Sequence, residues 1–225
     1  MAQAGIHALV GLAFRKVTPR WEYLVLGLVL GNLLPDADNL AVAVATVAKL
    51  PTEGLHRTFT HSLFTVALIF LIFWLVSALT RKRKWFNLGL GLSLGVLMHI
   101  LLDLLVWFNG VAILWPLPTW VNLWTNVQTP VWWDKLMMPI EFLFLAIFFW
   151  GLMVLARKGN SDTGFLKTLR FWTIVQMVLF VTFLILVYTM SAGFMTIFGA
   201  VYLLSLGLAF FVAIRMRKTI GVVAT

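Results

Sequence analysis

The stretch WFNLGLGLSLGVLMHILLDLLVWF, residues 85–108, decides the class of this protein. Its only ionisable side chains are His99 and Asp103. About 20 consecutive apolar residues are enough for a helix to cross the hydrocarbon core of a membrane. The stretch therefore predicts a membrane-spanning helix that carries two groups which are unfavourable in lipid.

Similar apolar runs fill most of the 225-residue chain, which is 62% hydrophobic and 11% charged. Globular proteins have about 25% charged residues, so a water-soluble enzyme is excluded. Two short apolar runs, residues 4–14 and 21–34, occur in addition to five long ones. The sequence predicts an all-α, multi-pass transmembrane bundle of about seven spans, with a short interfacial or re-entrant helix over 41–50. The five long runs are 62–79, 85–108, 139–156, 171–188 and 194–214.

We expect one integrated domain. Residues 1–120 carry the motifs described below, and residues 121–225 supply the end of a Trp-rich loop and accessory helices. No linker or internal repeat divides the two parts.

Basic residues predict the orientation. Alternating connections place fourteen of the seventeen Lys and Arg residues on one side, opposite Lys49, Arg57 and Lys135. The positive-inside rule makes the crowded side cytoplasmic. Seven spans then predict a cell (inner) membrane protein with its N-terminus outside and its C-terminus in the cytoplasm. The net charge of +9 is thereby assigned to orientation and contact with membrane lipids, and no nucleic acid partner is expected.

The outer loop, residues 109–138, contains five of the eleven tryptophans. An interfacial aromatic belt is the favoured interpretation, and a platform on which substrate stacks is the alternative. The five are Trp115, Trp120, Trp124, Trp132 and Trp133.

Seven ionisable side chains lie inside or at the edges of apolar segments. Each charge at mid-bilayer costs about 2.5 to 3.5 kcal/mol, and divalent metal ions would offset this by binding carboxylates and imidazoles together. Because the chain has no cysteine, such a site must consist of His, Asp and Glu. The seven are His7, Asp36, Asp38, His56, His61, His99 and Asp103.

Spacing brings several of these groups together. His99 and Asp103 are four residues apart and share one helix face, and the stripe continues back to Gly95 and Gly91, where a neighbouring helix can approach closely. Gly27 and Gly31 repeat this pattern. His7 reaches the level of His99 only if the first helical hairpin is raised or tilted, because it lies closer to its basic turn.

The segment LPDAD, residues 34–38, breaks a helix at Pro35. Asp36 either caps the following helix or binds metal, and Asp38 is expected to be a ligand. Glu141 and Asp134, near the outer end of the next span, are possible further ligands or bases.

The segment HRTFTHS, residues 56–62, predicts a loop that leads into a helix near Ser62, since its two histidines cannot share a helix face. His61 is the favoured ligand. His56 either supports a ligand or acts as a general acid. Arg57 either binds a phosphate or carboxylate group or extends to a lipid headgroup.

The order of motifs resembles the YdjM-like family of LexA-regulated, membrane-bound metal-dependent hydrolases. An early His is followed by LPDAD, HRTFTHS, HILLD at 99–103, and Gly110, Val111, Trp115 and Pro116, within about the first 120 residues. The family is in turn distantly similar to zinc-dependent phospholipase C. The resemblance implies phosphoester hydrolysis and marks the same seven residues as metal ligands or active-site residues. Thr58 and residues 106–109 depart from the family pattern, which predicts an altered loop shape.

These observations favour a membrane hydrolase in which one or more Zn²⁺ ions activate water. We expect His56, Arg57 and Asp36 to be catalytic and a lipid or lipid-linked phosphoester at the outer headgroup level to be the substrate. Two alternatives are a transporter of metal ions or small solutes and a structural membrane protein. The predicted metal ligands are His7, Asp36, Asp38, His61, His99 and Asp103, with the first two in supporting positions.

Overall fold

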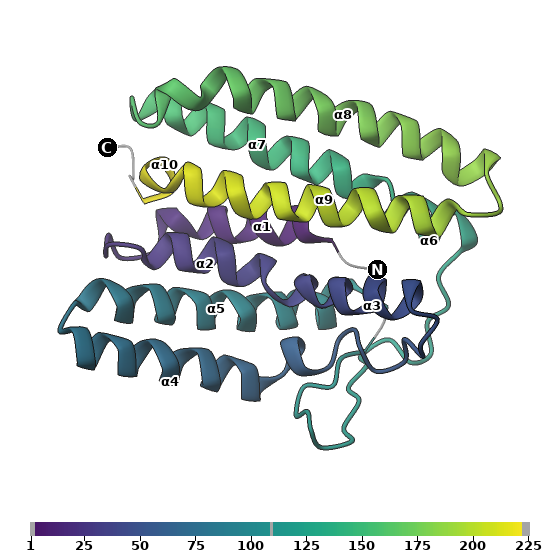
Figure 1. Ribbon diagram of the computed structural model, residues 1–225, viewed down its shortest axis with the longest axis horizontal. Coiled ribbons are helices and arrows are strands. Elements are labelled where there is room, and N and C mark those ends of the chain that lie inside the picture. Colours follow the sequence, from purple (N-terminus) through teal and green to yellow (C-terminus); the bar gives the residue numbers. More distant parts are fainter. Residues whose placement is uncertain (1–2, 109, 222–225) are drawn as a thin grey trace.

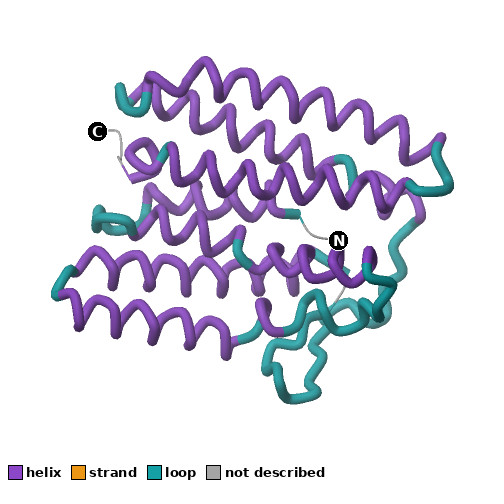
Figure 2. Tube along the Cα trace, viewed as in Figure 1, coloured by secondary structure: helices purple, strands orange, loops and turns teal. Residues whose placement is uncertain are grey.

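The computed structural model describes residues 3–108 and 110–221 and is helical, with no β-strand in the described residues (Figure 2). This confirms the prediction of an all-α fold. Short 3₁₀ turns, η1 to η4, connect or extend several helices (Figure 1). The α-helices are α1 (Ala4–Ala13), α2 (Leu24–Leu33), α3 (Asn39–Val47), α4 (Leu63–Thr80), α5 (Arg83–Val106), α6 (Val131–Met137), α7 (Ile140–Lys158), α8 (Leu166–Thr189), α9 (Phe194–Arg215) and α10 (Arg217–Gly221).

Six helical segments in the described residues are long and apolar enough to cross a membrane. The prediction of about seven spans is therefore too high by one. Helix α1 has ten residues and is about 15 Å long, half of a hydrocarbon core of about 30 Å. The six segments are Leu24–Val47, Leu63–Thr80, Arg83–Val106, Val131–Lys158, Thr163–Thr189 and Phe194–Arg215.

The predicted interfacial helix over 41–50 is instead the second half of a broken span. Helix α3 continues α2 beyond the 3₁₀ turn η2 (Pro35–Asp38), and together they form a run of 24 residues (Figure 1). Pro35 lacks the N–H that a continuous helix needs, so the chain tightens into a 3₁₀ turn at this point. Irregular backbone at membrane depth is tolerated where it lines a site inside the protein.

The glycine stripes form the closest helix contact, between α2 and α5. A Cβ added at Gly95 would lie 2.5 Å from the carbonyl oxygen of Leu28, and one added at Gly27 would lie 3.0 Å from Cα of Gly91. The prediction that a neighbouring helix approaches Gly91 and Gly95 closely is confirmed, and that neighbour is α2. It holds the break at Pro35 beside the C-terminal half of α5.

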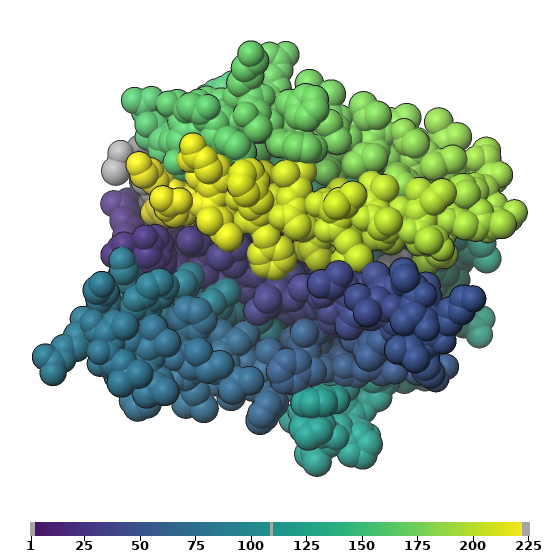
Figure 3. Space-filling model, viewed as in Figure 1, coloured from purple at the N-terminus to yellow at the C-terminus, as the bar shows by residue number. Residues whose placement is uncertain are grey.

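The second half of the chain packs directly on the first. One apolar core contains Ala8 of α1, Val29 of α2, Leu145 and Phe149 of α7 and Ala209 of α9. In the space-filling view α9 crosses the first two helices, and the loop between α5 and α6 projects from the body (Figure 3).

The basic turns gather at one end of the bundle, as the grouping of Lys and Arg predicts (Figure 1). Arg83 and Lys84 of α5 each lie 5.8 Å from an aromatic ring of the α1–α2 connection, Trp21 and Tyr23 respectively. The α4–α5 hairpin extends beyond the α1–α2 hairpin at this end (Figure 1). This offset is the raised first hairpin that brings His7 level with His99.

Candidate metal centre

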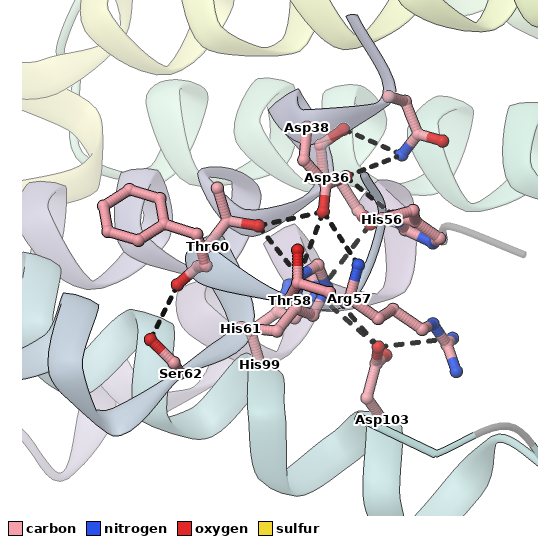
Figure 4. Close-up of polar contacts among 12 residues, drawn as sticks. Asp36, Asp38, His56, Arg57, Thr58, Thr60, His61, Ser62, His99 and Asp103 are labelled. Atoms are coloured by element: carbon pink, nitrogen blue, oxygen red, sulfur yellow. Dashed lines mark hydrogen bonds and ion pairs between the residues drawn. The ribbon is translucent and has the colours of Figure 1, made fainter. Parts of the chain in front are cut away.

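All seven predicted side chains meet in the interior of the bundle. Figure 4 shows six of them converging from η2, the segment 56–61 and α5, and His7 joins them from α1 through Asp103 and His99. Six of the seven residues are at most 8% exposed. His56 is the exception, with 24% of its side chain exposed.

The break in α2 fixes the orientation of the His99 ring. Nδ1 of His99 lies 2.7 Å from the backbone carbonyl oxygen of Asn32. This carbonyl is among the last four of α2, which lack intrahelical donors. A carbonyl only accepts, so Nδ1 of His99 donates, and Nε2 of the neutral ring carries a lone pair.

Asp38 and Thr60 fix the His61 ring in the same way. Nδ1 of His61 lies 3.2 Å from Oδ2 of Asp38 and 3.0 Å from the hydroxyl of Thr60. The Thr60 hydroxyl donates to Asp38 at 2.9 Å, so Nδ1 of His61 donates to this pair and Nε2 is left as an acceptor. Burial also lowers the pKa of His61, which favours the neutral ring.

The two acceptor nitrogens face each other. Nε2 of His61 and Nε2 of His99 are 3.2 Å apart. Two lone pairs at this distance repel each other unless a proton or a cation lies between them. Two nitrogen ligands about 2.05 Å from a tetrahedral Zn²⁺ are about 3.3 Å apart, so the spacing fits a shared ion.

Two carboxylates complete this set of donors. Oδ2 of Asp103 lies 3.6 Å from Nε2 of His61 and 3.9 Å from Nε2 of His99, and Oδ1 of Asp36 lies 3.8 Å from His99. Oδ2 of Asp36 is buried without a hydrogen-bond partner in the described residues. The side chain of Asp36 makes no capping bond, so the capping alternative is wrong.

Asp38 differs from the other carboxylates because protein donors surround both of its oxygens. Oδ1 receives His56 Nδ1 at 2.7 Å, and Oδ2 receives the backbone N–H of Arg57 at 3.0 Å in addition to Thr60 and His61. A carboxylate has about four lone-pair sites, and all are engaged here. Asp38 is therefore placed to orient two histidines, and its direct ligation of a metal ion stays a prediction.

His7 and Asp103 form a second part of the centre. The His7 ring stacks on His99 with centroids 3.6 Å apart, and its Nε2 lies 3.2 Å from Oδ1 of Asp103. Nδ1 of His7 is buried without a hydrogen-bond partner in the described chain. Three overlapping sets of donor atoms, each within 4.8 Å of one another, are compatible with a metal ion: His7, His99 and Asp103; Asp36, His61 and His99; Asp38, His56 and His61.

Arg57 belongs to the centre and does not extend to the lipid surface. It is 3% exposed, and its guanidinium lies 3.2 Å from Oδ2 of Asp103 (Figure 4). Its backbone has a φ of +62°, an uncommon value that brings its N–H to Asp38. The headgroup interpretation of Arg57 is wrong, and a cation is instead held beside the donor cluster.

The two further carboxylates lie outside the donor sets. Glu141 is fully buried and accepts the backbone N–H of Gly5, and Asp134 accepts the hydroxyl of Thr129. The sequence did not predict the contributions of Asn32 or Thr60. Thr60 lies within the HRTFTHS motif and could have been suspected, whereas no sequence signal points to a backbone carbonyl.

The sequence profile of the YdjM inner membrane protein family matches residues 2–196. The chain belongs to this family. The YdjM match extends well beyond the first 120 residues in which the motifs were recognised and includes α6, α7 and α8. No curated protein and no solved structure matched the chain significantly.

Proposed function

We propose that this YdjM-family protein is a metal-dependent hydrolase of the inner membrane that acts on a phosphoester of a lipid or lipid-linked substrate. The observation that carries the proposal is the pair of Nε2 atoms of His61 and His99, 3.2 Å apart with both Nδ1 atoms engaged elsewhere. Histidine ligands typically have their second nitrogen held by a carbonyl or carboxylate in this manner.

The ion would be held by His61, His99, Asp36 and Asp103, with His7 beside Asp103. A divalent cation, with Zn²⁺ the best fit to nitrogen and oxygen donors, supplies Lewis acidity and lowers the pKa of bound water. The unpartnered oxygen of Asp36 is suited to accept a proton or to bind the ion.

Arg57 and His56 supply the remaining chemistry. The guanidinium of Arg57 lies next to Asp103 and offers charge to a developing phosphoryl anion. His56 is held by Asp38 through Nδ1, while its Nε2 has no hydrogen-bond partner in the described residues. A partly exposed imidazole that is oriented by a carboxylate suits proton donation to a leaving group.

The position of the centre favours a lipid-like substrate. The donors lie within or beside membrane-spanning segments, away from the basic end of the bundle. The positive-inside rule assigns the basic end to the cytoplasm, so the centre lies toward the outer leaflet. A soluble phosphoester has no need of such a site, whereas a lipid headgroup is already at this depth.

Metal content and turnover test the proposal. The protein is purified in detergent without chelators, its metals are measured by mass spectrometry, and release of phosphate or headgroup from defined phospholipids is followed. We expect bound zinc and turnover in the wild type, loss of both in His61→Ala and Asp103→Ala, and retention of both in Glu53→Gln, which changes an exposed carboxylate.

Equal, near-zero metal in all samples would exclude the hydrolase. Bound metal with ion flux in proteoliposomes and no hydrolysis would favour the transporter alternative.

A further inference from the structure

A pocket of about 570 Å³ lies beside the metal centre, between the end of α5 and helix α6. Its walls are formed mainly by aromatic side chains and one carboxylate. The residues that matter here are Trp107, Phe108, Thr129, Trp133, Asp134 and Met137.

Two aromatic rings of the pocket meet at a right angle. The rings of Phe108 and Trp133 have centroids 6.0 Å apart and planes inclined at 86°, and Trp107 forms a further wall. Several aromatic side chains thus line one pocket, and pockets with aromatic walls are suited to bind an organic ammonium group. Trp133, one of the five tryptophans assigned to the interfacial belt, also lines this pocket.

The carboxylate in the pocket has no cationic partner. Oδ1 of Asp134 accepts the Thr129 hydroxyl at 2.9 Å, and Asp134 forms no ion pair with any residue of the described chain. The neighbouring Lys135 is directed elsewhere, with its Nζ 5.0 Å from the ring of Tyr188. An aromatic pocket that contains a free carboxylate attracts a cation.

One residue of the pocket wall also has a buried donor without an acceptor. Trp107 is 6% exposed, and its indole N–H has no hydrogen-bond partner in the described residues. A ligand that carries both a cation and an anionic oxygen would place its cation against Asp134 and the aromatic walls of this pocket. Zwitterionic lipid headgroups, in which an ammonium group is linked to a phosphodiester, have this composition.

Two hydrogen bonds link residues of the pocket to helices that carry the metal centre. The backbone N–H of Trp107 donates to the carbonyl of Asp103 at 3.2 Å, one turn from a candidate ligand. The side chain of Gln3, just before α1, donates to the carbonyl of Met137. The pocket thus borders the C-terminal end of α5 and the start of α1, the two helices that carry His7, His99 and Asp103.

We propose that the pocket formed by Trp107, Phe108, Trp133 and Asp134 binds the organic ammonium group of a zwitterionic lipid headgroup. As a statement about substrate, this rests on the proposed hydrolase function. Binding of the headgroup in the pocket is tested without metal and without turnover. The headgroup, and not a free amine, is the expected source because the pocket faces the expected level of the outer leaflet.

The test is a lipid titration of the purified, chelator-treated protein, followed by native mass spectrometry. Phosphatidylethanolamine is compared with phosphatidylglycerol, which lacks the ammonium group. We expect the wild type to bind phosphatidylethanolamine about tenfold more tightly, the scale of a desolvated cation–π contact with a carboxylate. Asp134→Asn and Trp133→Leu should abolish this preference. Trp132→Leu is the matched control, because Trp132 is exposed and does not line the pocket.

Equal binding of the two lipids by the wild type would overturn the proposal, as would an identical preference in Asp134→Asn and Trp132→Leu. Titration with soluble ethanolamine and O-phosphoethanolamine distinguishes a lipid headgroup from a free amine as the ligand. Competition by O-phosphoethanolamine against phosphatidylethanolamine supports the headgroup site, whereas binding of soluble ethanolamine without any lipid preference overturns it. A protein that binds zinc and hydrolyses both lipids at equal rates would retain the proposed function and lose this inference alone.

Discussion

Both carboxylate oxygens of Glu141 lie 3.1 Å from the backbone nitrogen of Gly5, so a buried acid at the start of α7 holds the first turn of α1. His7 is two residues further along α1 and stacks on His99. The contact gives the second half of the chain a direct part in positioning the centre.

Replacing Glu141 separates this positioning role from direct chemistry. Glu141→Gln retains an oxygen that accepts the N–H of Gly5, whereas Glu141→Leu has none. We expect Glu141→Leu to lower zinc affinity about tenfold or more and Glu141→Gln to remain near wild type, as measured by competition with a chromophoric chelator. Equal loss in both variants would indicate instead that Glu141 acts through its charge.

Asp38→Asn should weaken metal binding without abolishing it. Asp38 orients His56 and His61 through hydrogen bonds, and loss of such partners typically reduces metal affinity about 10- to 100-fold. Asp103→Ala, in contrast, should remove binding under the same titration. If the two variants lose metal to the same extent, Asp38 is a direct ligand, as the sequence predicted.

Arg57→Lys should affect turnover more than metal content. Lysine retains the positive charge beside Asp103 but lacks the planar pair of donors that the proposed function assigns to a phosphoryl group. We expect kcat/KM for phospholipid hydrolysis to fall on the order of 100-fold with zinc stoichiometry unchanged. A wild-type kcat/KM in this variant would rule out a phosphoryl contact by the guanidinium.

Gly95→Ala should open the contact between α2 and α5. Its Cβ would lie 2.5 Å from the carbonyl oxygen of Leu28, which is backbone and cannot rotate away, so we expect destabilisation of about 1 to 3 kcal/mol. Gly207→Ala is the matched control, since a Cβ at this position of α9 meets no atom within 4 Å. The unfolding midpoints of the two variants are compared by thermal unfolding in detergent. Equal midpoints would show that the contact between α2 and α5 tolerates a methyl group.

The metal-free protein should lose stability in mild acid because of His61. Burial lowers the pKa of His61 below its usual value of 6.5, so the unfolded chain takes up a proton below about pH 6.5 that the folded protein resists until a lower pH. Stability conferred by the neutral ring is thus present above this window and declines as the pH falls through it. Between pH 8 and 5 the unfolding midpoint should fall less steeply in His61→Gln than in the wild type. Parallel pH profiles of the two proteins would contradict this.

Much of the fold follows from local sequence patterns. Runs of apolar residues predicted the long helices within a few residues, and the glycine spacing predicted faces open to close helix approach, whereas the pairing of α2 with α5 comes from the structure. The short α1 was counted as a span because its apolar run alone does not reveal how far it extends through the bundle. The break at Pro35 was recognised, but the continued direction of α3 depends on packing against α9, which local pattern does not encode.

The sequence predicted which residue types form the centre. It predicted less well what each residue does there. A nearly uncharged chain that places histidines and aspartates in its apolar segments implies that they meet. Asp36 has an unpartnered oxygen, whereas Asp38 has none. This difference depends on the loop geometry around Arg57 and Thr60. Two carboxylates two residues apart in sequence thereby acquire different environments.

The donors of the centre come from four separate segments: α1, η2, the turn before α4, and α5. An ion bound among them would act as a covalent cross-link does in a secreted protein, tying together parts of a chain that has no cysteine. Removal of the ion by a chelator would free all four segments at once. Metal removal should therefore change the protease sensitivity of the whole bundle and not of one loop.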